Sequence, residues 1–231
     1  MKKIFLFLLL AASAAYGLLL YKPALYFGSS REYKCFTLRA SGELPAAVDT
    51  VLDKVLERLS TSEFFTPDTR FEVYLAAGPG EFGAFCPFVS GEYVRVNPLS
   101  GGIFLAAADF PENRALPARG EAQPRLLSRV IAAAAARELV RRKLEVLTYL
   151  FMRPWKTTGY AERVSGGLEQ YVPADLCAKA SPAGSPLGDY KYGLAVDFVM
   201  NDERISFSDL LDKNYSYESV EKQLMRRYCG K

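Results

Sequence analysis

The sequence predicts an α+β fold with a small, mostly antiparallel sheet in the N-terminal half and a helical C-terminal half. Short apolar segments separated by glycine and proline fill residues 34–107, which is typical of strands and turns. From residue 124 onward the apolar residues recur at helical spacing. Because 50% of the 231 residues are apolar, the chain can bury a substantial hydrophobic core.

The first 22 residues form a targeting segment. Lys2 and Lys3 precede an apolar run from Ile4 to Leu20, whose 17 residues span roughly 26 Å as a helix, against a hydrocarbon core of ~30 Å. One interpretation is an uncleaved signal anchor; the other is a signal peptide cleaved after Ala14, which would release a secreted domain. In both, the positive end stays in the cytoplasm and the rest of the chain lies outside it.

After the targeting segment, residues 23–33 are expected to be a juxtamembrane linker and residues 34–231 a single domain. The chain has four cysteines, an even number. Because an exported domain lies in an oxidising compartment, these cysteines can form disulfides. Three connectivities are possible, and pairing Cys35 with Cys86 and Cys177 with Cys229 would join each half to itself. The alternative is buried free thiols.

The elements of the N-terminal half follow from alternation and turn residues. Proline at position 45 suits the first turn of a helix, and an apolar stripe continues to about residue 60. Turn residues at 98–102 predict a hairpin. The predicted strands are 34–39, 71–76, 93–97 and 103–107, followed by a loop over 111–123.

The C-terminal half is predicted to be helical. A long helix starts near Pro124 and contains the alanine run 132–136. A short apolar stretch covers 146–152, and a helix beginning at Pro154 is ended by two glycines after residue 165. Further helices are predicted over 190–200, 206–212 and 216–228.

Composition excludes several classes of function. The chain has no histidine, which rules out a Ser-His-Asp or Cys-His triad and any zinc site with a histidine ligand. A net charge of +3 without a basic block gives no indication of nucleic-acid binding. We therefore expect no cofactor, no metal and no nucleic-acid partner.

The alanine-rich helix, a gap and then the segment WKTTGYAE (155–162) together resemble the gluzincins, the thermolysin-like zinc metallopeptidases. The similarity in the order of elements extends over residues 34–228 and is nearest to small, membrane-anchored bacterial members. It implies a zincin-like fold in which the sheet packs on the long helix. In that family this helix carries HExxH, with two zinc-binding histidines and a glutamate that acts as general base, and the second helix supplies a third ligand.

The resemblance assigns the family's site to five positions of this chain. The two histidine positions are Ala133 and Arg137, and the general-base position is Ala134. The third-ligand position is Thr158, and Glu162 matches an acidic residue that supports a zinc-bound histidine. The resemblance thus implies a degenerate site without zinc ligands. The structural alternative is an α+β domain of other ancestry, in which the alanines allow another element to pack closely on the helix.

Arg137 could pair with Glu162 in the former cleft, or lie at the surface beside Glu138 and Arg141. Tyr160, Tyr190 and Tyr192 could line the same cleft, although tyrosines of this kind are more often half-buried structural residues.

The function expected is that of a non-catalytic pseudopeptidase. It would bind a protein or peptide in the former cleft, with an edge strand at 103–107 pairing with an extended chain. The alternative is a metal-independent hydrolase that uses Glu138, Glu162 or another pair of acidic residues that the sequence does not identify.

Overall fold

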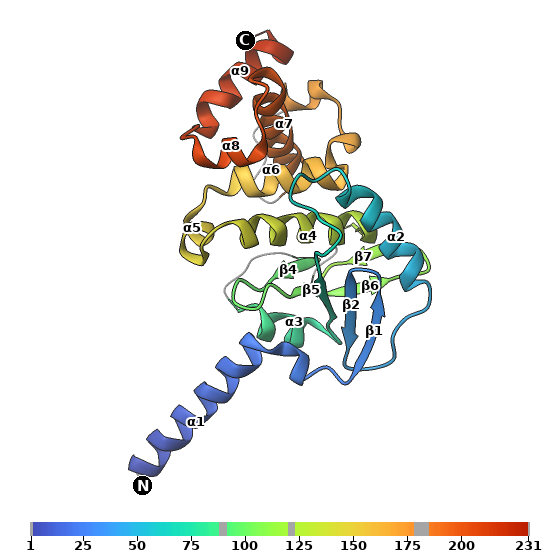
Figure 1. Ribbon diagram of the computed structural model, residues 1–231, viewed down its shortest axis with the longest axis vertical. Coiled ribbons are helices and arrows are strands. Elements are labelled where there is room, and N and C mark those ends of the chain that lie inside the picture. The colour runs from blue at the N-terminus through green and yellow to red at the C-terminus, as the bar shows by residue number, and fades with distance from the viewer. Residues whose placement is uncertain (1, 88–91, 120–122, 178–184, 231) are drawn as a thin grey trace. The chain divides into compact units, whose positions relative to one another are not determined.

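In a computed structural model, which describes residues 2–87, 92–119, 123–177 and 185–230, the chain has an α+β fold (Figure 1). The sheets lie in the N-terminal half and the C-terminal half is helical, so the predicted fold class is confirmed. The chain divides into two compact units. Unit 1 comprises Met1–Leu52 and Pro67–Leu127, and unit 2 comprises Asp53–Thr66 and Ser128–Lys231.

The main sheet of unit 1 has five strands in the order β1-β2-β3-β5-β4. Its outer pairs, β1 with β2 and β4 with β5, are antiparallel, whereas β3 is parallel to both β2 and β5. The sheet is therefore mixed, because helical connections follow β2 and β3 and return the chain in the same direction. The strand bounds are Ser29–Tyr33 (β1), Phe36–Ala40 (β2), Phe71–Leu75 (β3), Val94–Val96 (β4) and Ile103–Leu105 (β5).

Two expectations about this sheet were wrong. Residues 23–33 are not a linker, since they contain the 3-10 helix η1 (Pro23–Leu25) and β1, which pairs along its whole length with β2. Segment 103–107 is not an edge strand, since β5 lies between β3 and β4 and its three residues are buried. The edges are β1 and β4; β1 had no alternating pattern to reveal it, because its central side chains are exposed on both faces.

A second, three-stranded sheet follows in unit 1 with the order β6-β7-β8. Its strands are Ala107–Asp109 (β6), Arg114–Leu116 (β7) and Arg125–Leu126 (β8). The segment 111–123, predicted to be a loop, therefore contains a strand. Strands β7 and β8 have two or three residues each and stand next to a polar segment that contains proline, so no apolar run marked them in the sequence.

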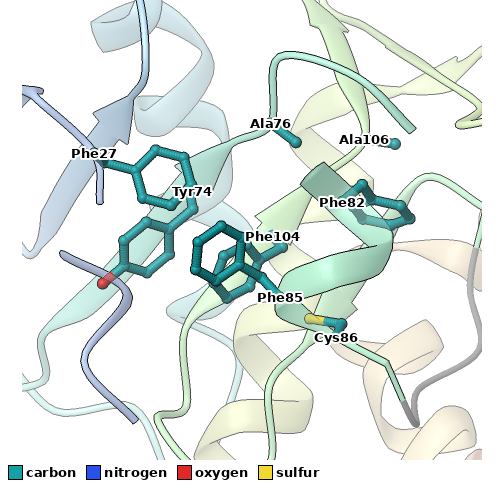
Figure 2. Close-up of a cluster of buried hydrophobic side chains, with 8 residues drawn as sticks. All are labelled: Phe27, Tyr74, Ala76, Phe82, Phe85, Cys86, Phe104 and Ala106. Carbon is teal, nitrogen blue, oxygen red and sulfur yellow. The ribbon is translucent and has the colours of Figure 1, made fainter. Parts of the chain in front are cut away.

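The core of unit 1 is an aromatic cluster (Figure 2). The Phe104 ring stacks on Tyr74 and on Phe85, with ring centroids 4.6 Å and 5.3 Å apart. Phe27 packs on Tyr74 at 4.9 Å and on Phe85 at 5.3 Å. The cluster joins the segment after η1 to two central strands and to helix α3 (Pro79–Phe85).

Unit 2 is built from helices. The boundary between the units falls within helix α2 (Val48–Leu59), whose residues from Asp53 onward belong to unit 2. Helix α6 (Pro154–Ser165) is capped at its C-terminal end by Gly166, which adopts a left-handed φ of 75° that favours glycine. The other elements, most of them predicted to within a few residues, are α4 (Leu127–Lys143), α5 (Val146–Phe151), α6 (Pro154–Ser165), η2 (Gly167–Gln170), η3 (Pro173–Cys177), α7 (Pro186–Asp202), α8 (Phe207–Asp212) and α9 (Tyr217–Cys229).

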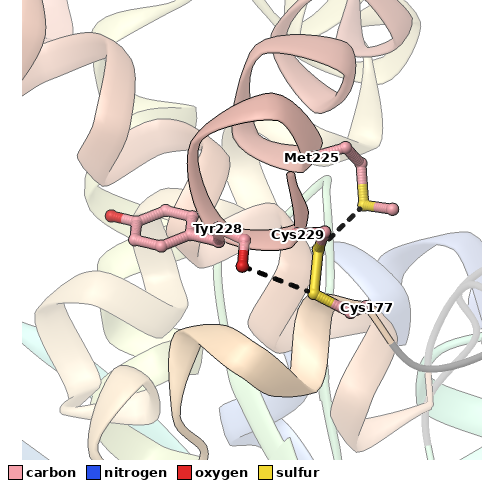
Figure 3. Close-up of a disulfide and its surroundings, with 4 residues drawn as sticks. All are labelled: Cys177, Met225, Tyr228 and Cys229. Carbon is pink, nitrogen blue, oxygen red and sulfur yellow. Dashed lines mark hydrogen bonds between the residues drawn. A yellow bond between two sulfur atoms is a disulfide. The ribbon is translucent and has the colours of Figure 1, made fainter. Parts of the chain in front are cut away.

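A disulfide joins Cys177 at the end of η3 to Cys229 at the end of α9 (Figure 3). The two Cα atoms are 5.7 Å apart, and the bond closes a chain segment of 52 residues. Cys35 and Cys86 are buried free thiols. The structure thus selects one of the pairings that the sequence left open and leaves the other pair reduced.

Candidate functional site

The site positions inferred from the resemblance all lie in unit 2, on two helices. Ala133, Ala134 and Arg137 are on α4, and Thr158 and Glu162 are on α6. Ala133 and Ala134 are buried within a run of alanines that is buried from residue 132 to 136. Small side chains allow close packing around this part of α4, which is a structural reason for the alanine run.

Arg137 is half-buried and lies near Tyr149 of α5, together with Glu138 and Arg141. Burial raises the pKa of the Tyr149 phenol, and the charges of Arg137 and Arg141 oppose this rise. Among the described residues no ion pair joins Arg137 to Glu162. Glu138 is paired with Arg141 and Arg142, and Arg137 lies close enough to Tyr149 for its charge to act on that phenol.

Glu138 is the buried carboxylate of α4. Its exposed fraction is 0%, and it accepts hydrogen bonds from Arg141 Nε at 2.5 Å and Nη2 at 2.8 Å. Arg142 Nε donates to it as well, at 2.8 Å. Both oxygens of this buried carboxylate are thus bound by guanidinium groups of the same helix, which gives Glu138 a structural role.

Glu162 is enclosed by two glycines. A Cβ atom on Gly167 of η2 would lie only 1.9 Å from Glu162 Oε2, and one on Gly193 of α7 would lie 3.0 Å from Glu162 Cβ. The glutamate therefore occupies space that these glycines leave open. Packing gives a reason for its presence that does not involve a former metal site.

The other residues of WKTTGYAE also have structural roles. A Cβ atom on Gly159 would lie 2.3 Å from the Tyr192 carbonyl oxygen, so only glycine permits the close crossing of α6 and α7. The Tyr160 ring stacks on Phe207 at 3.9 Å, and its hydroxyl lies 2.8 Å from Ser62 Oγ. Thr158 is half-buried on the same helix. The motif that carries the resemblance is thus also a helix-packing motif.

Lys156, which the sequence did not single out, is buried. Its Nζ donates to the carbonyl oxygens of Leu210 at 2.8 Å, Leu211 at 3.2 Å and Lys213 at 2.7 Å. Burial lowers the pKa of this ammonium group, and the nearby Arg153 adds to the effect. The lysine caps the C-terminal end of α8, where free carbonyl groups and the helix dipole favour a cation.

Within the described residues no three side chains of Cys, Asp or Glu gather in a way that could hold a metal ion.

The most distinctive surface of unit 2 is apolar. Helix α5 has no buried residue, and it exposes four large apolar side chains, with Phe151 85% exposed. These side chains are Val146, Leu147, Leu150 and Phe151.

In unit 1, the end of helix α1 (Lys2–Tyr21) is joined to the folded domain. Tyr16 donates its hydroxyl hydrogen to the Ala84 carbonyl oxygen at 2.6 Å. Asn97 donates from Nδ2 to the carbonyl oxygens of Leu20 at 3.1 Å and Phe85 at 2.9 Å. Leu20 is buried, and Leu19 packs against the aromatic cluster.

Comparisons with protein-family models, with curated proteins and with solved structures gave no match. The similarity to the gluzincins consequently rests on the residues quoted from the sequence.

Proposed function

We propose that this chain is a membrane-anchored, extracytoplasmic, non-catalytic binding domain whose scaffold derives from the gluzincins. Helix α1 is its uncleaved signal anchor, and a protein partner docks on α5. The exposed apolar face of α5 is the observation that carries the binding role, because exposed apolar patches of this kind mark interaction sites. The proposed surface adjoins one of the five positions that the resemblance assigns, because Arg137 lies near Tyr149 of α5.

The non-catalytic part of the proposal is supported by the roles of the acidic residues. Glu138 is held by Arg141 and Arg142, and Glu162 is packed against Gly167 and Gly193. Both candidate acids of the alternative, a metal-independent hydrolase, thus have structural tasks.

The location is supported by two features. Helix α1 is long and apolar enough to cross a membrane, as a signal sequence also would be. The bond between Cys177 and Cys229 fits an oxidising compartment.

Alkylation of thiols in intact cells, followed by mass spectrometry, should find these two cysteines bonded and the intact N-terminus in the membrane fraction. Reduced cysteines or an N-terminus at Ala15 would contradict this location or the anchor, respectively.

Photo-crosslinking tests the binding surface. A benzophenone amino acid replaces Phe151 on α5 or, as a control, the exposed Glu218 on α9. We expect one discrete protein adduct from position 151 and none from position 218, and we expect Leu147→Ser to weaken it at least tenfold. Adducts with lipid only, or equal adducts from both positions, would contradict a protein partner on α5.

Metal analysis and a broad peptidase assay test the absence of catalysis. We expect neither bound zinc nor hydrolysis, and hydrolysis lost on Glu162→Ala would establish the alternative.

Ancestry is tested by restoring the three ligands with Ala133→His, Arg137→His and Thr158→Glu, which leaves the fully buried Ala134 unchanged. The folded triple variant should bind one zinc ion more tightly than a variant lacking the Thr158 change.

A further inference from the structure

Helix α1 is continuous with the rest of unit 1, because its last turns are built into the fold. The bonds from Tyr16 to Ala84 and from Asn97 to Leu20, with Leu20 buried, fix the end of the helix to α3 and to the turn after β4. No flexible linker therefore separates the anchor from unit 1.

The part of α1 that stands clear of unit 1 is too short to cross a bilayer. Its side chains are exposed from Ile4 to Leu18, and these 15 residues span roughly 22 Å, below a hydrocarbon core of ~30 Å. The whole apolar run to Leu20 spans roughly 26 Å. The docked turns must therefore also enter the bilayer, and the neighbouring surface of unit 1 must enter with them.

The surface of unit 1 next to the docked turns is suited to that position. It exposes Leu25 (67%), Tyr26 (51%) and Leu99 (55%), and we name these three residues the collar. Segment 16–27 contains a single charge, the cation Lys22, and segment 97–102 contains none. Apolar and aromatic side chains beside a lysine are typical of the boundary between hydrocarbon and headgroups.

The collar is held in place by the fold. The Tyr26 ring packs on Phe27 and Phe85 of the aromatic cluster, with centroids 5.3 Å and 5.2 Å apart. Leu99 follows Asn97, whose Oδ1 accepts from the Leu99 amide at 2.8 Å while its Nδ2 donates to Leu20. One side chain thus couples the collar to the end of α1.

We infer that unit 1 is seated on the membrane that α1 crosses, with Leu25, Tyr26 and Leu99 inserted at the level of the lipid headgroups. The inference rests on the proposed anchor role of α1. The partner of this surface is the same bilayer, since the surface continues directly from the membrane-spanning segment.

The depth of single residues in vesicles tests the inference. The full chain, with Leu25→Cys or Leu99→Cys, is labelled with an environment-sensitive fluorophore and reconstituted in phosphatidylethanolamine–phosphatidylglycerol vesicles that carry nitroxide lipids. The native thiols do not interfere, because Cys177 and Cys229 are bonded and Cys35 and Cys86 are buried. Leu8→Cys reports insertion of α1, and Leu116→Cys on the exposed strand β7, which lies apart from α1 in Figure 1, is the control.

We expect headgroup nitroxides to quench positions 25 and 99 about twofold or more, chain nitroxides to quench position 8, and neither to quench position 116. If position 8 is quenched while 25 and 99 behave like 116, the collar inference is overturned and the anchor stands. If position 8 is not quenched either, the anchor itself fails. Bright, unquenched labels at 25 and 99 would indicate a protein cover and would also overturn the inference.

Discussion

At the scale of single residues, a buried polar side chain can stabilise the fold in a way that the sequence does not reveal. Lys156 satisfies three carbonyl groups at the end of α8, where a helix this short leaves them without intrahelical partners. The sequence shows only a lysine beside a tryptophan, so this role could not be predicted.

Replacing Lys156 by methionine keeps most of the side-chain volume and removes the donor. We expect the free energy of unfolding to fall by about 2–3 kcal/mol, because the carbonyl oxygens of Leu210 and Leu211 lose the ammonium donor. Urea denaturation measures the loss. The same change at Lys222, which is exposed on α9, should cost less than about 0.5 kcal/mol. Equal midpoints for the two variants would show that Lys156 has no capping role.

Cys86 gives a prediction about pH. Burial raises the pKa of its thiol from 9.0 to about 12. Between these values the unfolded chain releases the proton and the folded chain keeps it, so the free energy of unfolding must fall as the pH rises. We expect Cys86→Ala to remove up to about 1.4 kcal/mol per pH unit of this slope between pH 9 and 12. Parallel curves for the two proteins would contradict the buried thiol.

At the scale of elements, the crossing of α6 and α7 depends on glycines. Gly159 lies where any Cβ atom would meet the backbone of Tyr192, and Gly193 lies where one would come close to Leu168 and Glu162. The glycine of the WKTTGYAE segment is thereby explained by packing in this fold.

Gly159→Ala should therefore lower the free energy of unfolding by about 1–3 kcal/mol or more, since the two backbones must move apart. Gly83→Ala is the matched control, because a Cβ atom at this helical position of α3 meets nothing within 4 Å. That change should stabilise by about 0.5–1 kcal/mol through helix propensity. Thermal or urea unfolding measures both, and a neutral Gly159→Ala would refute the close crossing.

At the scale of the whole molecule, the disulfide restrains the C-terminal part of unit 2. It closes a segment of 52 residues, which corresponds to about 4 kcal/mol of stabilisation in the chain-entropy model. The replacement of Cys177 and Cys229 by serine should lower the free energy of unfolding of unit 2 by an amount of this order. Reductant should destabilise the native chain by a similar amount and leave the serine variant unchanged; sensitivity of that variant to reductant would implicate other groups.

The sequence by itself determined the apolar N-terminal helix, the fold class and most helices of the C-terminal half. These depend on local properties: an uninterrupted apolar run, helical periodicity and glycine or proline at the ends, as in α6 between Pro154 and Gly166. The absence of histidine likewise fixed which catalytic sites the chain cannot have.

The tertiary structure decided what depends on contacts between distant residues. It placed β5 inside the sheet, made residues 29–33 a strand, and paired Cys177 with Cys229. It also joined the end of α1 to Asn97, 77 residues away. Strand order, disulfide pairing and burial of polar groups are set by the packing of the complete chain, so no local pattern encodes them.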